Sequence, residues 1–125
     1  MSEPLIELHR LAIEAVSEKK ATGILVLDLR NRSDLTDYFL ICSGKTHVQV
    51  QAIADAILEK TVGTPYKVVS TEGYQSGNWV ILDLGDMIAH VFKHDIRKYY
   101  DLERLWGDVP VIAEVSERSD FEELQ

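Results

Sequence analysis

The chain has 125 residues, of which 46% are hydrophobic and 27% charged, the size and composition of one globular domain. Its formal net charge of −8 argues against general nucleic-acid binding through a basic footprint and leaves room for a basic protein partner. A single cysteine, Cys42, excludes an internal disulfide. No signal peptide opens the sequence and no apolar stretch approaches the length of a membrane span, so we expect a cytoplasmic protein.

Helical and strand patterns alternate in the first half of the chain. Helices are indicated where apolar residues recur every three or four positions, and strands where short apolar runs lie between turn residues. Thr46 and Gln49 have the spacing of a capping box, which marks the start of a helix. The expected elements are a helix that begins at Ser2 with a stripe reaching Lys19, strands at Ile24–Leu29 and Tyr38–Cys42, a helix from Thr46 to Thr61, and a strand at Tyr66–Ser70.

The next segment is a hairpin whose register follows from its turn. Two alternating apolar runs, Trp79–Leu84 and Met87–Phe92, are joined by Gly85-Asp86, a two-residue connection typical of tight hairpins. Side chains alternate across a strand, so one face of the hairpin is wholly apolar and should lie on the core: Val80, Leu82, Leu84, Met87, Ala89 and Val91. The opposite face carries Trp79, Ile81, Asp83, Ile88, His90 and Phe92.

This second face has two interpretations. A sheet covered on both sides would leave its ionisable residues, Asp83 and His90, near the edges. Alternatively, the face is a partly exposed docking surface anchored by Trp79, because the centres of protein interfaces favour aromatic residues with polar neighbours.

After the hairpin we expect a short helix, a strand and an acidic tail. The helix, from Ile96 to Trp106, would place a stripe of apolar residues on one side, with Trp106 sealing the core. A short strand is expected within Val109–Val115. We assign residues 1–113 to one domain and residues 114–125 to an acidic, mobile C-terminal tail.

Patterns for catalysis or metal binding are weak. His90 and His94 are four positions apart, but four residues of a strand span about 13 Å, which is too far for two ligands of one ion unless the chain bends sharply. Asp83 and Asp86 flank the hairpin turn, where roles in the turn and at the strand end explain them more simply than acid–base chemistry. Ser43 has no Gly-rich phosphate loop around it. The sequence therefore predicts no metal and no cofactor.

Six motifs together resemble the iojap-like ribosomal silencing factors. They are DYFLICSG at 37–44, AIAD at 52–55, EG at 72–73, WVILDLGD at 79–86, HVF at 90–92 and YYDLERLW at 99–106. Each motif is generic, but their order and spacing from Leu5 to Pro110 make the resemblance specific. The chain departs from the family pattern at Gln49-Val50, where the family usually has His-Val, and Gln49 suits a capping role.

The resemblance implies both a fold and a function. Family members look like an α/β domain with a mixed, roughly five-stranded sheet flanked by helices, similar in outline to nucleotidyltransferases. They bind the large ribosomal subunit through its protein fourteen, a basic protein, and sterically block joining of the small subunit, which represses translation. The family's docking tryptophan falls on Trp79. We expect the ribosomal-protein-binding residues to be Trp79, Ile81, Asp83, Asp86, Ile88 and His90.

Two alternative functions remain open. A nucleotidyltransferase-like enzyme would place Gly-Ser at the head of a helix and Asp-x-Asp on a following strand, whereas this chain has Ser43-Gly44, and its Asp83 and Asp86 are three apart across a turn. The other is a large-subunit assembly or scaffolding role, with a homodimer of the free protein formed through the exposed sheet face. We expect no enzymatic activity, no sequence-specific nucleic-acid contact and no membrane contact.

Overall fold

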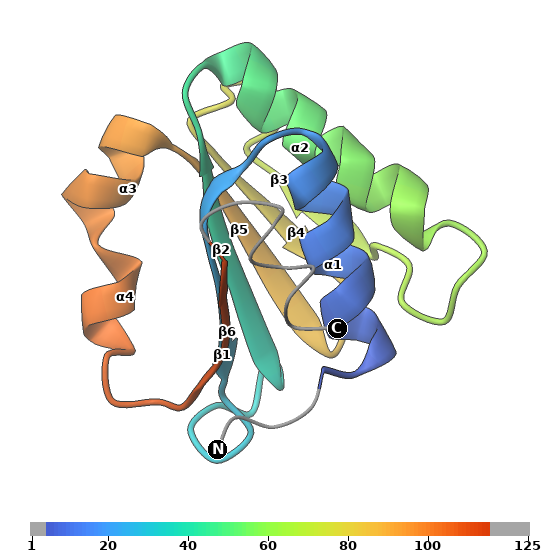
Figure 1. The fold of residues 1–125 in the computed structure, drawn as a ribbon, viewed down its shortest axis with the longest axis vertical. Coiled ribbons are helices and arrows are strands. Elements are labelled where there is room, and N and C mark those ends of the chain that lie inside the picture. The colour runs from blue at the N-terminus through green and yellow to red at the C-terminus, as the bar shows by residue number, and fades with distance from the viewer. Residues whose placement is uncertain (1–4, 116–125) are drawn as a thin grey trace.

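Two parallel strands, β2 (Tyr38–Gly44) and β5 (Met87–Lys93), lie at the centre of a computed structural model that describes residues 5–115. Antiparallel neighbours extend the sheet on both sides, which gives a mixed α/β fold with six strands in the order β3-β4-β5-β2-β1-β6, one more than expected (Figure 1). The other elements are α1 (Glu7–Glu18), β1 (Thr22–Asp28), α2 (His47–Thr61), β3 (Ser70–Glu72), β4 (Trp79–Asp83), α3 (His94–Tyr100), α4 (Leu102–Leu105) and β6 (Val111–Val115).

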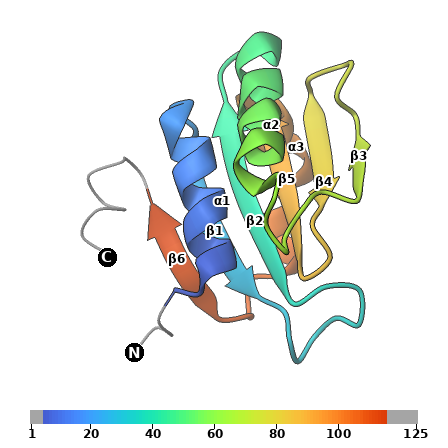
Figure 2. The same ribbon diagram turned by 90° about the vertical axis from the view of Figure 1, so that its right-hand side faces the viewer.

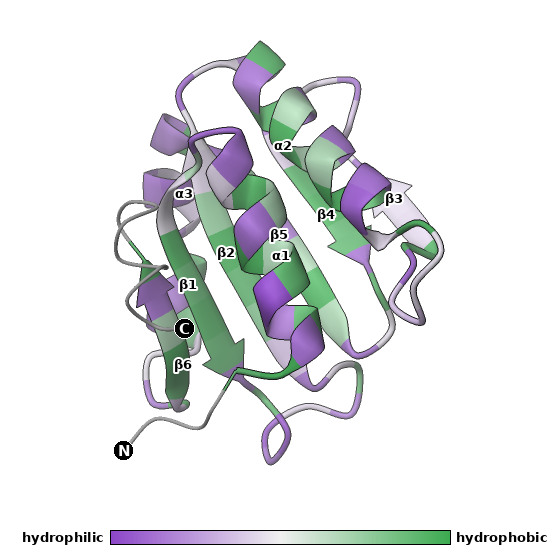
Figure 3. Cartoon of the chain, turned by 45° about the vertical axis from the view of Figure 1, so that its right-hand side comes forward, coloured by the Kyte–Doolittle hydropathy of each residue, from purple (hydrophilic) through white to green (hydrophobic). Residues whose placement is uncertain are grey.

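The helices cover the two faces of the sheet unequally. The longer helices α1 and α2 pack side by side on one face, and the short helices α3 and α4 lie on the other (Figures 1 and 2). The main core lies beneath α1 and α2, where the central strands are largely hydrophobic (Figure 3). A smaller core beneath α3 and α4 contains Leu27, Leu29, Phe39, Ile41, Phe92 and Val109. Between residues 5 and 115, no helix has the length and apolar character needed to cross a membrane.

The register of the β4–β5 hairpin is confirmed. Trp79 lies opposite Phe92 and Asp83 lies opposite Ile88, as the turn predicts. Gly85 has a φ of +83°, a conformation that glycine adopts without strain, which explains the glycine in this turn. The residues predicted to face the core are all buried: Val80, Leu82, Leu84, Met87, Ala89 and Val91.

The helix caps agree in part with the sequence analysis. The Thr46 hydroxyl accepts a hydrogen bond from the Gln49 backbone N–H at 3.1 Å, so Thr46 is the N-cap of α2 as predicted. The Gln49 side chain reaches back one residue further than a capping box requires and accepts from the Lys45 N–H at 2.6 Å. Helix α1 begins at Glu7 rather than at Ser2, which lies with residues 1–4 outside the described range.

The prediction of a strand at Tyr66–Ser70 is wrong. The Val69 N–H donates to the Asp83 carbonyl at 2.7 Å, and the strand itself begins at Ser70 and continues to Glu72. Tyr66 and Val68 instead place partly buried side chains against the main core from an irregular segment. Their apolar alternation therefore reflects packing on the core and not membership of the sheet.

The helix predicted from Ile96 to Trp106 is broken into α3 and α4. Asp101 lies between them in the left-handed conformation, with a φ of +47°. Because helical periodicity holds only along a continuous helix, the predicted apolar stripe does not form. Ile96 and Leu102 pack on the smaller core, whereas Tyr99 and Leu105 are 81% and 71% exposed.

Strand β6 extends to Val115, two residues into the segment predicted as the tail. Glu114 lies opposite Leu25 of β1, and the Val115 side chain is buried. The remainder of the predicted tail, residues 116–125, lies outside the described residues.

Gly73 provides a test of the close packing beneath the start of β4. Its φ is +79°, and a Cβ atom there would overlap the carbonyl oxygen of Trp79. We predict that Gly73→Ala lowers the free energy of unfolding by more than about 2 kcal/mol, because the overlap adds to the cost of about 1 kcal/mol for a non-glycine residue in this conformation. Urea denaturation measures the decrease.

Gly63→Ala is the matched control for this substitution. Gly63 has the same φ of +79°, but nothing lies within 4 Å of the position that its Cβ would occupy. The control should therefore be destabilised only by the conformational cost of about 1 kcal/mol. Equal destabilisation at the two positions would contradict the close approach of Gly73 to Trp79.

Candidate functional site

Aromatic rings gather on the sheet face beneath α3 and α4. Trp79 stacks on Phe92 with ring centroids 4.8 Å apart, and it contacts Tyr100 of α3 at 4.9 Å. Phe39 of β2 contacts His90 at 4.6 Å and Trp106 at 5.6 Å. Three strands and the α3–α4 segment thus contribute to one aromatic cluster, which consists of Phe39, Trp79, His90, Phe92, Tyr100 and Trp106.

His90 orients the Trp79 indole. The two side chains are diagonal neighbours on adjacent strands, and the indole Nε1–H donates a hydrogen bond to His90 Nδ1 at 3.1 Å. A neutral imidazole that accepts at Nδ1 carries its proton on Nε2. Burial lowers the pKa of His90 to about 4, so the ring is neutral at pH 7. At physiological pH, His90 is therefore already in the protonation state that accepts the hydrogen bond from Trp79.

The sheet face beneath α3 and α4, which we call the outer face, is partly covered and partly accessible, so the cover and the exposure expected by the two interpretations made from the sequence each hold for a part of it. Phe92 and His90 are buried on the side covered by α3 and α4, and His90 is only 6% exposed. His90 therefore packs behind the accessible side chains and is not one of them. Two short helices do not cover the full width of the sheet, and the side towards β4 stays accessible. Of the residues predicted to bind, Asp86 is exposed and the following are half-buried: Trp79, Ile81, Asp83 and Ile88.

Tyr100 belongs to this accessible part of the face; its place beside Trp79 did not follow from the sequence, where Tyr100 lay on a charged, aromatic helix face that was either a docking surface or simply solvated. Its side chain is 54% exposed and contacts Trp79. A continuous helix gives no reason to place Tyr100 beside the hairpin. The sequence feature that could have indicated the break in the helix is Asp101, since aspartate is among the few residues that tolerate the left-handed conformation that ends α3.

Carboxylates gather where β2 and β5 begin. The backbone N–H groups of Asp37 and Tyr38 both donate to the Asp86 carbonyl, at 3.1 and 3.0 Å, which joins the loop before β2 to the hairpin turn. Within residues 5–115, none of these carboxylates forms an ion pair with a lysine or arginine. We call this surface the acidic end of the sheet; it consists of Asp34, Asp37, Asp83 and Asp86.

Ser43 and Cys42, whose side chains are potential nucleophiles, are both buried. The hydroxyl of Ser43, which is 1% exposed, accepts a hydrogen bond from Arg97 Nη1 at 2.9 Å. The same Arg97 nitrogen donates to the Gly23 carbonyl at 2.7 Å, and this pair of bonds anchors α3 on the sheet. Burial raises the pKa of the Cys42 thiol to about 12, so it is protonated and a poor nucleophile. In the described part of the chain, no three His, Cys, Asp or Glu side chains are grouped to hold a metal ion.

Over residues 5–115, this α/β domain has a half-covered aromatic face and, at one end of its sheet, carboxylates without ion-pair partners, which are features that protein interfaces share. The sequence model of the family described as "Ribosomal silencing factor during starvation" matches residues 2–125, and the chain belongs to this family. The match extends beyond Pro110, where the resemblance drawn from the motifs ends.

Relatives and solved structures agree with this assignment. Ribosomal silencing factor RsfS of Halalkalibacterium halodurans is 43% identical over 106 residues, which cover 85% of this chain and 91% of that protein. Ribosomal silencing factor RsfS of Bacillus subtilis is 45% identical over 102 residues, which cover 82% of this chain and 86% of that protein. The crystal structure of protein CV0518 from Chromobacterium violaceum superposes with a TM-score of 0.78 at 37% identity, covering 81% of this chain and 84% of that one.

We predict that His90 stays neutral, with its proton on Nε2, from about pH 7 to about pH 5, because burial holds its pKa near 4. An unfolded histidine titrates near 6.5, so His90 would remove stability as the pH falls from about 6.5 towards 4, by about 1.4 kcal/mol per pH unit. Long-range ¹H–¹⁵N NMR of the ring nitrogens reports both the tautomer and the titration. A His90 signal that titrates near 6.5 would contradict the buried hydrogen bond to Trp79.

Proposed function

We propose that this protein binds the large ribosomal subunit through its protein fourteen and hinders joining of the small subunit, so that translation is repressed. Membership of the ribosomal silencing factor family carries the proposal. The mechanism is steric: the bulk of the bound domain occupies space that the small subunit needs. Such a mechanism requires a docking surface and no reacting group.

The accessible part of the aromatic cluster supplies the apolar centre of the proposed docking surface. Trp79 and Tyr100 present adjoining rings, and Ile81 and Ile88 widen the patch on the same sheet face. The bond to His90 and the stack on Phe92 restrict the indole before any partner arrives. A restricted side chain loses less conformational entropy on binding, which favours affinity.

The acidic end supplies the charge complementarity. The Asp83 and Asp86 carboxylates lie at the far end of the hairpin from Trp79, separated by about 13 Å along β4. Asp83 Oδ1 also accepts a hydrogen bond from the Gly85 N–H at 2.8 Å, which holds that carboxylate in place beside the turn. Lysine or arginine side chains of a basic ribosomal protein would pair with these carboxylates while its apolar residues cover Trp79.

A role in assembly of the large subunit is a second candidate. A mouse relative, 28% identical over 101 residues, is named "Mitochondrial assembly of ribosomal large subunit protein 1", and this chain covers 43% of its length. The same docking surface would serve that role. Deletion of the protein would then cause precursors of the large subunit to accumulate in growing cells, which sucrose gradients would resolve; a pure silencing role leaves assembly unchanged.

We further propose that the free protein forms a homodimer through the same face. Tyr99 and Leu105 are 81% and 71% exposed beside Tyr100, and a second copy would cover them. Dimerisation and ribosome binding would then compete for Trp79. A Trp79→Ala variant that dimerises as well as wild type, measured by analytical ultracentrifugation, would contradict this overlap.

Trp79→Ala should weaken binding to isolated large ribosomal subunits by about thirtyfold or more, since truncation of a central aromatic anchor costs at least about 2 kcal/mol. Co-sedimentation over a range of protein concentrations measures the affinity. Tyr66→Ala is the matched control, because Tyr66 is also a partly buried aromatic residue but packs on the main core. We expect the control to bind like wild type.

Tyr100→Ala separates a binding defect from a folding defect. The ring is 54% exposed, so its removal leaves the cores intact and should still weaken co-sedimentation. Wild-type binding by both Trp79→Ala and Tyr100→Ala would contradict the docking surface. Failure of the wild-type protein itself to co-sediment would contradict the proposed function.

Charge removal at the acidic end should slow association. We predict that Asp83→Asn/Asp86→Asn lowers the association rate with isolated protein fourteen several-fold at about 50 mM salt and reduces its salt dependence, because exposed charges mainly steer the encounter. Biolayer interferometry measures the rate. Glu7→Gln/Glu59→Gln removes the same charge from exposed positions on α1 and α2 and is the control. Equal effects of the two double variants would refute specific steering.

A further inference from the structure

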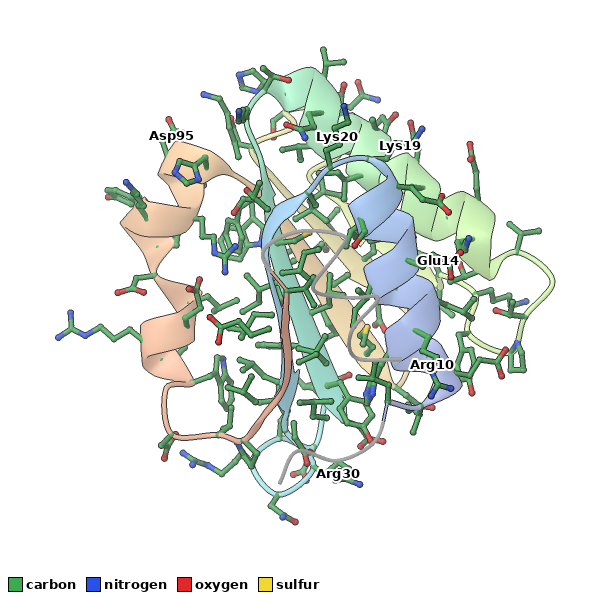
Figure 4. The ribbon with its side chains drawn as sticks, in the orientation of Figure 1. Arg10, Glu14, Lys19, Lys20, Arg30 and Asp95 are labelled. Atoms are coloured by element: carbon green, nitrogen blue, oxygen red, sulfur yellow. The ribbon has the colours of Figure 1, made fainter. Side chains whose placement is uncertain are left out.

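Lysines surround the end of the sheet opposite the acidic end. The strands β2 and β5 finish together there, at Gly44 and Lys93. Figure 4 shows two of these lysines, Lys19 and Lys20, beside the first turn of α2, whereas Arg30 lies at the other end of the molecule. We call this surface the basic end; its lysines are Lys19, Lys20, Lys45, Lys93 and Lys98.

Gln49 holds one side of the basic end together. Its side-chain amide donates to the carbonyls of Lys19 and Lys20, at 3.1 and 3.2 Å, and its side-chain oxygen accepts from the Lys45 N–H. The end of α1 and the start of α2 are thereby fixed beside each other.

The other side of the basic end is a hollow between the sheet and α3. Thr22, Lys45 and His94 line one cavity. Thr22 and His94 also line an adjoining cavity of about 360 Å³, together with Arg97 and Lys98. Lys45 and Lys98, which are distant in the sequence, therefore line adjoining cavities, and we call the two cavities together the recess.

Most of these ammonium groups lack a carboxylate partner. Within residues 5–115, no ion pair involves Lys19, Lys20, Lys45 or Lys98, and all four side chains are exposed. Lys93 pairs with Asp95 at 3.5 Å. Of the two acids that line the recess, Glu103 accepts a hydrogen bond from Arg97 Nε at 2.8 Å, and Asp101 is exposed at the outer rim. The recess is thus locally cationic in a chain of net charge −8.

We propose that the basic end binds the phosphate backbone of RNA. Lysine ammonium groups neutralise phosphates one by one without reading the bases, so the contact is independent of sequence. The inference rests on the proposed function in one respect: a ribosomal subunit contains RNA next to its basic proteins. A seven-residue strand spans about 20 Å, so the acidic end and the basic end contact two different components at once. Each contact then raises the effective concentration for the other.

Fluorescence anisotropy of the full chain with a labelled RNA duplex of unrelated sequence tests the proposal. At about 50 mM salt we expect binding in the range of sequence-independent contacts, about 10⁻⁴ to 10⁻⁶ M. Lys45→Glu/Lys98→Glu should weaken it by at least about tenfold and lower the slope of log affinity against log salt by about 2, because each lysine that no longer neutralises a phosphate lowers the slope by about one.

Arg10→Glu/Lys67→Glu is the matched control. Both side chains are exposed, neither lies at the basic end, and the change in net charge is the same. Equal weakening in the control, or no binding by the wild-type chain, overturns the proposal. So does displacement of the RNA by poly-glutamate of equal charge, which would indicate a surface for an acidic protein. The assay contains no ribosomal protein, so its failure is distinct from a failure of the co-sedimentation experiment.

Discussion

The parallel pairing of β2 with β5 is the constraint on which the rest of the structure depends. It joins two antiparallel units, β6-β1-β2 and β5-β4-β3, into one sheet. Parallel neighbours require a long connection, here residues 45–86, and this connection contains α2, which covers the main core. The pairing also gives the sheet its two chemically distinct ends, because both strands start beside Asp37 and Asp86 and both finish beside lysines. β2 is buried along its whole length, as expected of a central strand with a parallel neighbour.

The incomplete cover on the outer face is what leaves a surface for a partner. Helices α3 and α4 are held down by the hydrogen bonds of Arg97 to the sheet and by Ile96 and Leu102 in the smaller core. Phe92 and His90 are buried beneath these helices, whereas Trp79, which contacts Tyr100 of α3, stays half-buried, as do Ile81 and Ile88. A fully covered face would be inert and a fully open one would expose an apolar patch prone to aggregation. Partial cover leaves the Trp79 indole accessible while its contacts with His90 and Phe92 hold it in place, which suits the anchor residue of an interface.

Net charge alone describes this protein poorly. The value of −8 suggests repulsion from nucleic acid, yet within residues 5–115 exposed lysines without ion-pair partners gather at one end of the sheet and exposed carboxylates without such partners gather at the other. The ends lie about 20 Å apart, and at physiological ionic strength charges are screened over about 8 Å. Each end therefore presents its own charge to a partner that comes close. The two partners proposed above, a basic protein and RNA, would each meet one of these ends.

Local features were determined by the sequence itself. The two-residue turn at Gly85-Asp86 set the register of the hairpin, Thr46 marked the start of α2, and the order of the motifs indicated the family, because turn chemistry and capping depend on a few adjacent residues. Long-range packing decided the rest: the break at Asp101, the burial of His90, and the convergence of Lys20, Lys45 and Lys98 at one end. Such contacts join segments far apart in the chain, and periodicity carries no information about which distant segments meet.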